Sequence, residues 1–261
     1  MLFDTHCHLD VGSFPEGADA VISRANAAGV ATFACIGVGS LEHARAAVAL
    51  AERRTDVVAT VGIHPHDASQ ADAALEAELA KLAEHPRVVA VGEVGLDFHY
   101  DHSPRATQED VFRRGVALAR RLKKPLVIHT RNAPDATLAI LAAEGARDVG
   151  GIIHCFSEDR AFAARALELG FYLSFSGILT FKNAKAVHEV AAWAPEDRIL
   201  LETDSPYLAP VPLRGKKCEP AFVKHTASRL AELRGSDLDR IATLTTTNAA
   251  RVFGLPAPNG G

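Results

Sequence analysis

The first residues that suggest chemistry are two histidines separated by a single residue, His6 and His8. They follow the strand-like run Leu2–Thr5. Because side chains alternate between the two faces of a strand, residues i and i+2 point the same way. Two imidazoles about 6–7 Å apart along the chain can therefore reach a common cation. The pair alone also fits a chance arrangement on a solvated strand, so metal binding needs further support.

Four more candidates stand at the ends of other strand-like runs: Glu93, His129, His154 and Asp204. A buried acid or histidine between apolar residues costs free energy unless it is paired or bound to a metal. Core histidines satisfied by hydrogen bonds are common, so each residue taken singly is ambiguous. However, all six candidates have the same position relative to their predicted strands, and this shared position favours a metal site.

The elements that position these residues alternate along the chain. Eight short runs are expected to be strands: Leu2–Thr5, Ala31–Gly37, Val57–Ile63, Val88–Val94, Leu126–His129, Gly151–His154, Tyr172–Ser176 and Ile199–Glu202. Amphipathic, Ala-rich segments lie between them, and Ser236–Phe253 is expected to be an additional helix. This alternation predicts an α/β fold, a (β/α)8 TIM barrel forming one domain over residues 1–261. A doubly wound open sheet would give a similar pattern.

In a barrel, the carboxyl ends of all strands meet at one rim, where active sites are built. Six ligands are too many for one tetrahedral catalytic ion, which keeps an open position. We therefore expect two divalent ions, with Glu93 as the bridging carboxylate because it is central in chain order. The other ligands divide into His6, His8 and Asp204 on one ion and His129 and His154 on the other. Mixed imidazole and carboxylate ligands fit Zn, Mn or Fe and tolerate Mg with retained waters, and the sequence does not choose among these ions.

Composition limits the partners and the compartment. The net charge of −4 argues against a general polyanion-binding protein, whose surface would be basic. The four cysteines are widely spaced, which favours free thiols in a reducing compartment. We see no signal peptide and no apolar run near the roughly 20 residues that span a bilayer. These features predict a soluble cytoplasmic protein without a membrane segment, and they leave the oligomeric state open.

Seven blocks of sequence stand out in order along the chain: Phe3–Asp10, Gly62–His66, Gly92–Phe98, Val127–Arg131, His154–Ser157, Glu202–Tyr207 and Thr246–Ala249. Together they resemble the TatD family of metal-dependent deoxyribonucleases, within the larger amidohydrolase-like group of metallohydrolases. The resemblance covers essentially the whole chain, and several blocks in order are far more specific than any one alone. It implies a TIM barrel, divalent metal ions and hydrolysis of phosphodiester bonds in DNA, often as a 3′→5′ exonuclease. The family's metal positions fall on the six residues identified above.

One departure from the family pattern lies in the basic loop after the last predicted strand. The family often has Arg-Gly-Lys-x-Asn-x-Pro there, whereas this chain has Arg214–Pro220 with Cys218 in place of the asparagine. A cysteine at this position can alter the packing of the loop or its contact with a substrate. The departure therefore puts the role of the loop in doubt.

Hydrolysis of a phosphodiester needs an activated water and neutralised charge on the phosphoryl group, which two ions about 3.5–4 Å apart supply. We expect Asp204 either to orient the water and take its proton or to serve only as a ligand. Glu93 is expected to support catalysis by holding both ions. His64 lies on the same rim in a turn with Pro65, where it either donates to the phosphate or stabilises its own loop.

Three residues are expected to contact the DNA substrate, which is predicted to be single-stranded or to be held at a 3′ end. The guanidinium of Arg131 fits a phosphate, although a surface ion pair is the ordinary alternative. Arg214 belongs to a basic cluster that fits the nucleic-acid backbone or is simply solvated. Tyr207 is placed to stack on a base or to pack against its neighbours.

Two other functions stay open at this point. The same metal clamp polarises a carbonyl, so the substrate is alternatively an aminoacyl-tRNA ester or a small-molecule amide or lactone. The net negative charge fits a small molecule slightly better than DNA. The third possibility is a non-catalytic metal-binding barrel, against which the complete set of six ligands argues.

Overall fold

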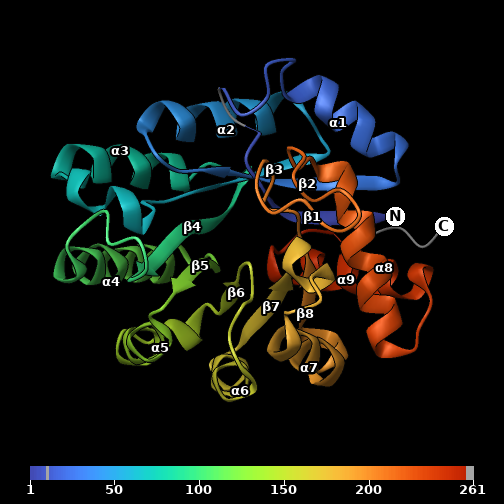
Figure 1. Ribbon diagram of the computed structural model, residues 1–261. Coiled ribbons are helices and arrows are strands. Elements are labelled where there is room, and N and C mark those ends of the chain that lie inside the picture. The colour runs from blue at the N-terminus through green and yellow to red at the C-terminus, as the bar shows by residue number, and fades with distance from the viewer. Residues whose placement is uncertain (10–11, 257–261) are drawn as a thin grey trace.

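The computed structural model describes residues 1–9 and 12–256, so Asp10 of the first sequence block lies outside the described residues. Eight parallel strands surround a central axis, and the helices form a ring outside them (Figure 1). The strands are β1 (Leu2–Cys7), β2 (Val30–Gly37), β3 (Val57–Val61), β4 (Val88–Asp97), β5 (Leu126–Arg131), β6 (Gly151–Ile153), β7 (Phe171–Phe175) and β8 (Ile199–Leu201). Each strand pairs with the next one in chain order.

The sheet closes between its first and last strands. A parallel bridge joins Cys7 to Ser205, just beyond the end of β8. The amide of His8 donates to the carbonyl of Ser205 at 2.8 Å, and the amide of Asp204 donates to the carbonyl of His6 at 2.9 Å. Since an open sheet would leave its two edge strands apart, the predicted TIM barrel is confirmed. The closure also places the two chain segments that carry three of the candidate ligands directly beside each other.

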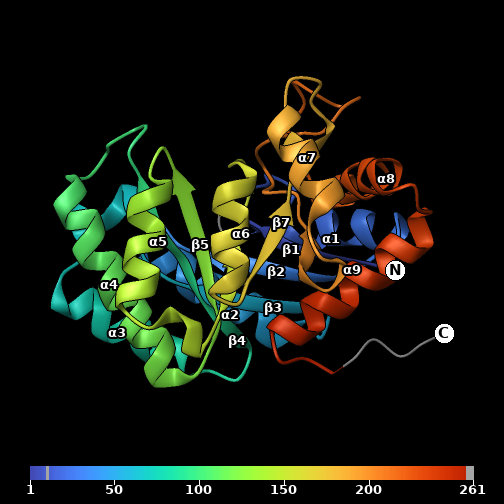
Figure 2. The ribbon, with the colours of Figure 1, turned by 90° about the horizontal axis from the view of Figure 1, so that it is seen from below.

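The helices cover the outside of the barrel, as two perpendicular views show (Figures 1 and 2). They are α1 (Ala18–Ala27), α2 (Leu41–Arg53), α3 (Ala73–Ala83), α4 (Arg105–Leu122), α5 (Pro134–Ala143), α6 (Arg160–Glu168), α7 (Lys185–Trp193), α8 (Val223–Arg234) and α9 (Leu238–Val252). The predicted helix-ending glycines, Gly29 and Gly170, both have the left-handed backbone that glycine adopts without strain, with φ of 92° and 87°. Among the described residues, no helix has the length and apolar character that crossing a bilayer requires.

Apolar side chains fill one end of the barrel, and the last helix covers it. Each strand contributes one residue to this cluster, except β4, which contributes two, and Phe253 just after α9 packs on Phe3 with ring centres 5.7 Å apart. In Figure 2, α9 crosses the molecule beside the amino terminus. The candidate ligands lie toward the opposite rim, where the strands end.

One strand differs from its prediction in a way that affects the site. β4 continues to Asp97, so Glu93 lies inside the strand and does not end it. The pairing of β4 with β5 shifts register between Gly92 and Val94, which allows the strand to continue. At Gly95 the two backbones are so close that an added Cβ would lie 2.0 Å from the carbonyl oxygen of His129. The absence of a side chain at this position therefore permits the longer strand.

We expect Gly95→Ala to lower the free energy of unfolding by about 3 kcal/mol or more, because the new methyl group has no space beside β5. Gly170→Ala is the matched control, since its φ is also positive but no atom lies within 4 Å of the added Cβ. It should cost only about 1 kcal/mol through backbone strain. Urea unfolding followed by circular dichroism measures both, and equal losses would contradict the close-approach explanation.

Candidate metal centre

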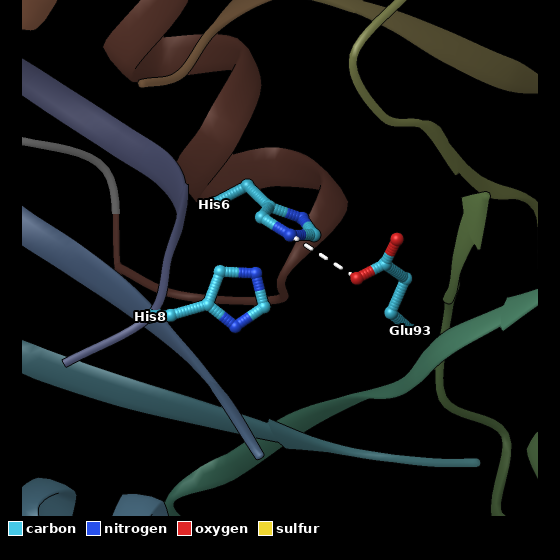
Figure 3. A group of neighbouring side chains, drawn as sticks. All are labelled: His6, His8 and Glu93. Atoms are coloured by element: carbon cyan, nitrogen blue, oxygen red, sulfur yellow. Dashed lines mark ion pairs between the residues drawn. The ribbon is translucent and has the colours of Figure 1, made fainter. Parts of the chain in front are cut away.

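Glu93 lies at the centre of the rim, and histidines from four strand ends surround its carboxylate. Oε2 is 3.4 Å from Nε2 of His6, and Figure 3 shows the rings of His6 and His8 near this carboxylate. The other oxygen, Oε1, lies 2.8 Å from Nδ1 of His129, 2.9 Å from Nε2 of His154 and 3.5 Å from Nε2 of His64. The two oxygens of one carboxylate therefore face different histidines.

The closure of the barrel brings Asp204 to the same cluster. Its Oδ1 lies 3.5 Å from Nε2 of His8 and 3.7 Å from Nε2 of His6. His8 directly follows β1 and Asp204 follows β8, so their proximity depends on the pairing of the first and last strands. All six residues predicted from the strand ends thus lie together in the structure. Their role as ligands stays a prediction.

Buried nitrogen and oxygen atoms in the cluster lack hydrogen-bond partners. His6 is fully buried, and among the described residues neither ring nitrogen makes a hydrogen bond, although Nε2 has the carboxylates of Glu93 and Asp204 at 3.4 and 3.7 Å. Such unpaired buried atoms cost free energy, and coordination to a cation satisfies them. Three groups have ligand atoms close enough to share an ion: His6, His8 and Glu93; His6, His154 and Glu202; and His64, Glu93 and His129. Mixed imidazole and carboxylate donors of this kind fit divalent metal ions.

The ionisation of the cluster also suits a cation. Burial alone would raise the pKa of Glu93, but His154, His64 and His6 outweigh this effect and hold the pKa well below its usual range. Burial likewise opposes ionisation of Asp204, yet its histidine neighbours, His8 first, lower its pKa. Burial lowers the pKa of His64 to about 4 despite the nearby Glu93 carboxylate. At neutral pH both carboxylates are therefore charged and His64 is neutral, which are the states that coordinate metals. Burial opposes protonation of His154, but Glu93 and Glu202 outweigh it and raise its pKa well above the usual range, so a cation bound there would displace a proton.

Glu202 is a contributor to the site to which the sequence patterns assigned no role. It is fully buried, and its Oε1 lies 3.1 Å from Nδ1 of His154 and accepts a hydrogen bond from the amide of Cys155 at 2.7 Å. A carboxylate on the second ring nitrogen fixes the orientation of a metal-binding histidine. The sequence feature that could have identified Glu202 is the one used for the predicted ligands: it is an acid at the end of an apolar strand-like run.

Asp97 is a second such residue. It is fully buried at the end of β4, and its Oδ2 lies 2.8 Å from Nε2 of His66 and 3.3 Å from Nε2 of His129. It therefore orients two histidine rings at once, one of them a predicted ligand. It lies four residues after Glu93 and beyond the predicted strand Val88–Val94, so only the longer β4 brings it to the rim.

Removing the carboxylate behind His154 should weaken metal binding. We expect Glu202→Ala to reduce metal affinity about 10- to 100-fold, since loss of such an outer carboxylate frees the ligand ring to rotate. Glu202→Gln should lose less, because the amide oxygen can still accept from the Cys155 amide. Competition with a fluorescent chelator measures the affinity, and an unchanged dissociation constant in Glu202→Ala would show that His154 needs no orientation.

His64 precedes the short helix η1 (Pro65–Gln70), and both of its ring nitrogens face a neighbour. Nδ1 accepts a hydrogen bond from the amide of His66 at 3.2 Å, which stabilises the turn. Nε2 faces Glu93 at 3.5 Å, which places the ring in the metal centre. The two roles considered for this residue are thus compatible in one conformation, and the catalytic one stays a prediction.

The three predicted substrate contacts lie on exposed parts of the rim and its loops. Tyr207 is 61% exposed, with its ring centre 6.0 Å from that of His8. The guanidinium carbon of Arg131 lies 4.6 Å from the ring centre of Tyr100, and that of Arg214 lies 4.0 Å from the ring centre of Phe181. All three are available to a ligand, and their contact with a substrate stays a prediction.

Cys218 in the basic loop is fully buried, and its amide donates to the carbonyl of Pro206 at 3.0 Å. Burial raises the pKa of its thiol, so the thiol is neutral at physiological pH. The cysteine therefore packs the base of the loop, while Arg214 and its basic neighbours remain exposed.

Comparison with known proteins agrees with this geometry. The model of the TatD related DNase family matches residues 3–254. The chain belongs to the TatD family. An uncharacterized metal-dependent hydrolase of Bacillus subtilis is 43% identical over 253 residues, covering 97% of this chain and 99% of the relative. A TatD protein of Erwinia amylovora, named a 3′-5′ ssDNA/RNA exonuclease, is 35% identical over 259 residues, with 97% and 100% covered.

A solved structure shows the same fold throughout. The crystal structure of a TatD homologue from Escherichia coli superposes with a TM-score of 0.91 at 30% identity and covers 98% of both chains. The TatD resemblance drawn from the sequence blocks is therefore confirmed. The chain is a member of a family of metal-dependent hydrolases, and the polar rim described above is the candidate metal centre of this member.

Proposed function

We propose that this TatD protein hydrolyses phosphodiester bonds of single-stranded nucleic acid, DNA above all, from the 3′ end with two divalent metal ions. The observation that carries the proposal is that the two oxygens of the Glu93 carboxylate face different histidines. Oε2 faces His6, whereas Oε1 faces His129 and His154. A carboxylate flanked by separate histidine sets suits a bridge between two ions. The exonuclease name of the Erwinia amylovora relative supports the choice of substrate.

The residues present would hold the ions in two sets. His6, His8 and Asp204 would form one, and His129 and His154 the other, with Glu93 shared. When bound, two such ions activate a water molecule and neutralise the charge of the phosphoryl group. Mg, Mn and Zn all fit donors of these types.

The remaining steps fall to side chains of the protein. Asp204 is held ionised by its histidine neighbours, so it can orient the attacking water and accept its proton. His64, neutral and buried beside Glu93, is placed to donate to the phosphate or the leaving oxygen. Arg131 and Arg214 would bind backbone phosphates, and Tyr207 would pack on a base near His8.

A second candidate is hydrolysis of an aminoacyl-tRNA ester or of a small-molecule ester, lactone or amide. The observation that favours a small molecule is the net charge of −4, which gives nucleic acid no general electrostatic attraction. The same centre would polarise a carbonyl in place of a phosphoryl group.

A single panel of assays separates these functions. The protein is stripped of metal with a chelator and then supplied with Mg²⁺, Mn²⁺ or Zn²⁺ in turn. A single-stranded oligonucleotide labelled at its 5′ end should shorten stepwise only when metal is restored. Metal-dependent turnover of esters or lactones without any shortening would replace the nuclease proposal with the second candidate. Binding of metal without turnover of either substrate would identify a non-catalytic barrel.

A further inference from the structure

Four exposed planar side chains gather beside the metal centre, and we call them the Tyr100 platform: His99, Tyr100, His102 and Arg131. Tyr100 is 50% exposed. The ring of His102 lies within 2° of parallel to the Tyr100 ring, with centres 5.5 Å apart. The Arg131 guanidinium carbon lies 4.6 Å from the centre of the Tyr100 ring. The surface thus brings a half-exposed tyrosine ring, exposed imidazoles and a planar cation together.

Buried polar side chains hold the loop that carries the platform. Oδ1 of Asp97 accepts hydrogen bonds from the amides of His99 at 2.9 Å and Tyr100 at 2.8 Å. At the other end of the loop, the side-chain amide of Gln108 donates to the carbonyl of Ser103 at 2.8 Å. Asp97, Ser103 and Gln108 are all fully buried. The loop backbone that carries His99, Tyr100 and His102 is therefore fixed before any ligand arrives, which lowers the entropic cost of binding.

The same carboxylate ties the platform to the metal centre. While Oδ1 of Asp97 holds the loop, its Oδ2 contacts His66 at 2.8 Å and His129 at 3.3 Å. The ring of His66 lies 5.5 Å from Tyr100 and 4.4 Å from His64, centre to centre. A continuous series of rings thus connects the platform to the side chains around Glu93. A group bound on the platform would have a fixed position relative to the reacting phosphate.

We propose that the Tyr100 platform is a stacking site for an unpaired nucleobase next to the scissile phosphate. Aromatic rings stack on bases of any sequence, because every base has a π face, and the Arg131 guanidinium over the Tyr100 ring would keep its place as the phosphate contact. In a duplex these faces are covered by neighbouring bases, so the platform accepts only single-stranded or frayed ends. This inference rests on the proposed nuclease function and adds the reason for a single-stranded substrate. Tyr207, beside His8, would contact a different nucleotide.

The test compares an oligothymidine with the same strand lacking its three 3′-terminal bases. Tyr100→Leu removes the ring and keeps an apolar side chain, while Tyr100→Phe keeps the ring and serves as the matched control. On the complete strand, Tyr100→Leu should lower kcat/KM about 10-fold, the effect of losing one base–aromatic stack, and Tyr100→Phe less than about 2-fold. On the abasic strand, wild type and Tyr100→Leu should differ by less than about 2-fold.

Binding to phosphorothioate-protected strands, measured by fluorescence anisotropy, separates the platform from the nuclease chemistry. If wild type cleaves no oligonucleotide but Tyr100→Leu still weakens binding of the base-containing strand alone, the nuclease proposal fails and the stacking site stands. Equal losses on both strands would show a structural role for Tyr100 and overturn the stacking site. An unchanged affinity and rate in Tyr100→Leu would overturn it as well. Thermal unfolding of each variant verifies that the protein is folded.

Discussion

Glu93→Ala is expected to abolish hydrolysis, with a fall in kcat of about 10³-fold or more. The carboxylate faces both histidine sets, through Oε2 toward His6 and through Oε1 toward His129 and His154. Its removal disrupts both predicted metal positions at once. Metal ions supply several kcal/mol of transition-state stabilisation, and each 1.36 kcal/mol is tenfold in rate.

The metal content of the purified variant distinguishes a bridge from a ligand to one ion. If Glu93 is shared, Glu93→Ala should bind both equivalents more weakly when metal is measured by elemental analysis after dialysis. Loss of one equivalent with the other retained would show that Glu93 serves a single ion. Glu168→Ala, an exposed acid at the end of α6, is the control and should keep both activity and metal. Full activity of Glu93→Ala would place the chemistry elsewhere.

Asp204→Asn should produce the second largest effect, a fall in kcat of about 10²- to 10⁴-fold, the range for loss of a general base. Asparagine keeps the size of the side chain and a potential metal-binding oxygen, but it cannot accept a proton from water. Asp204 lies 3.5 Å from His8 and 3.7 Å from His6, so the substitution tests the side of the centre opposite His129.

The comparison of rate with metal content decides between the two roles considered for Asp204. A variant that keeps its metal and loses kcat supports the role of proton acceptor. A variant whose activity returns when the metal concentration is raised identifies Asp204 as a ligand only. Asp239→Asn, at an exposed position in the first turn of α9, is the control for general effects of charge removal.

The sequence alone predicted the barrel, with an open sheet as the alternative, and it identified the candidate ligands. Eight apolar runs alternate with amphipathic segments, and both periodicities are local properties of the chain. A histidine or acid at the end of such a run is visible without knowing which strands are neighbours, as with His129 and His154. The barrel topology then brings these residues together, because its parallel strands all end at one rim.

The lengths of the strands and the partners of the side chains were harder to predict from the sequence. The prediction ended the fourth strand near Glu93, but β4 reaches Asp97 because Gly95 lets its backbone approach β5 closely. Whether a strand continues past a register shift depends on the neighbouring strand, which the local pattern does not contain. The positions of Asp97 and of the platform loop follow from that longer strand.

The tertiary structure decided which atoms meet. Glu202 contacts His154 across 48 residues of sequence, and Asp204 approaches His8 only because β1 and β8 close the barrel. Asp97 holds both a loop and two histidines through the two oxygens of one carboxylate. The sequence therefore determined which residue types reach the rim, since that depends on local periodicity. Their mutual orientation required the fold, since it depends on contacts between segments far apart in the chain.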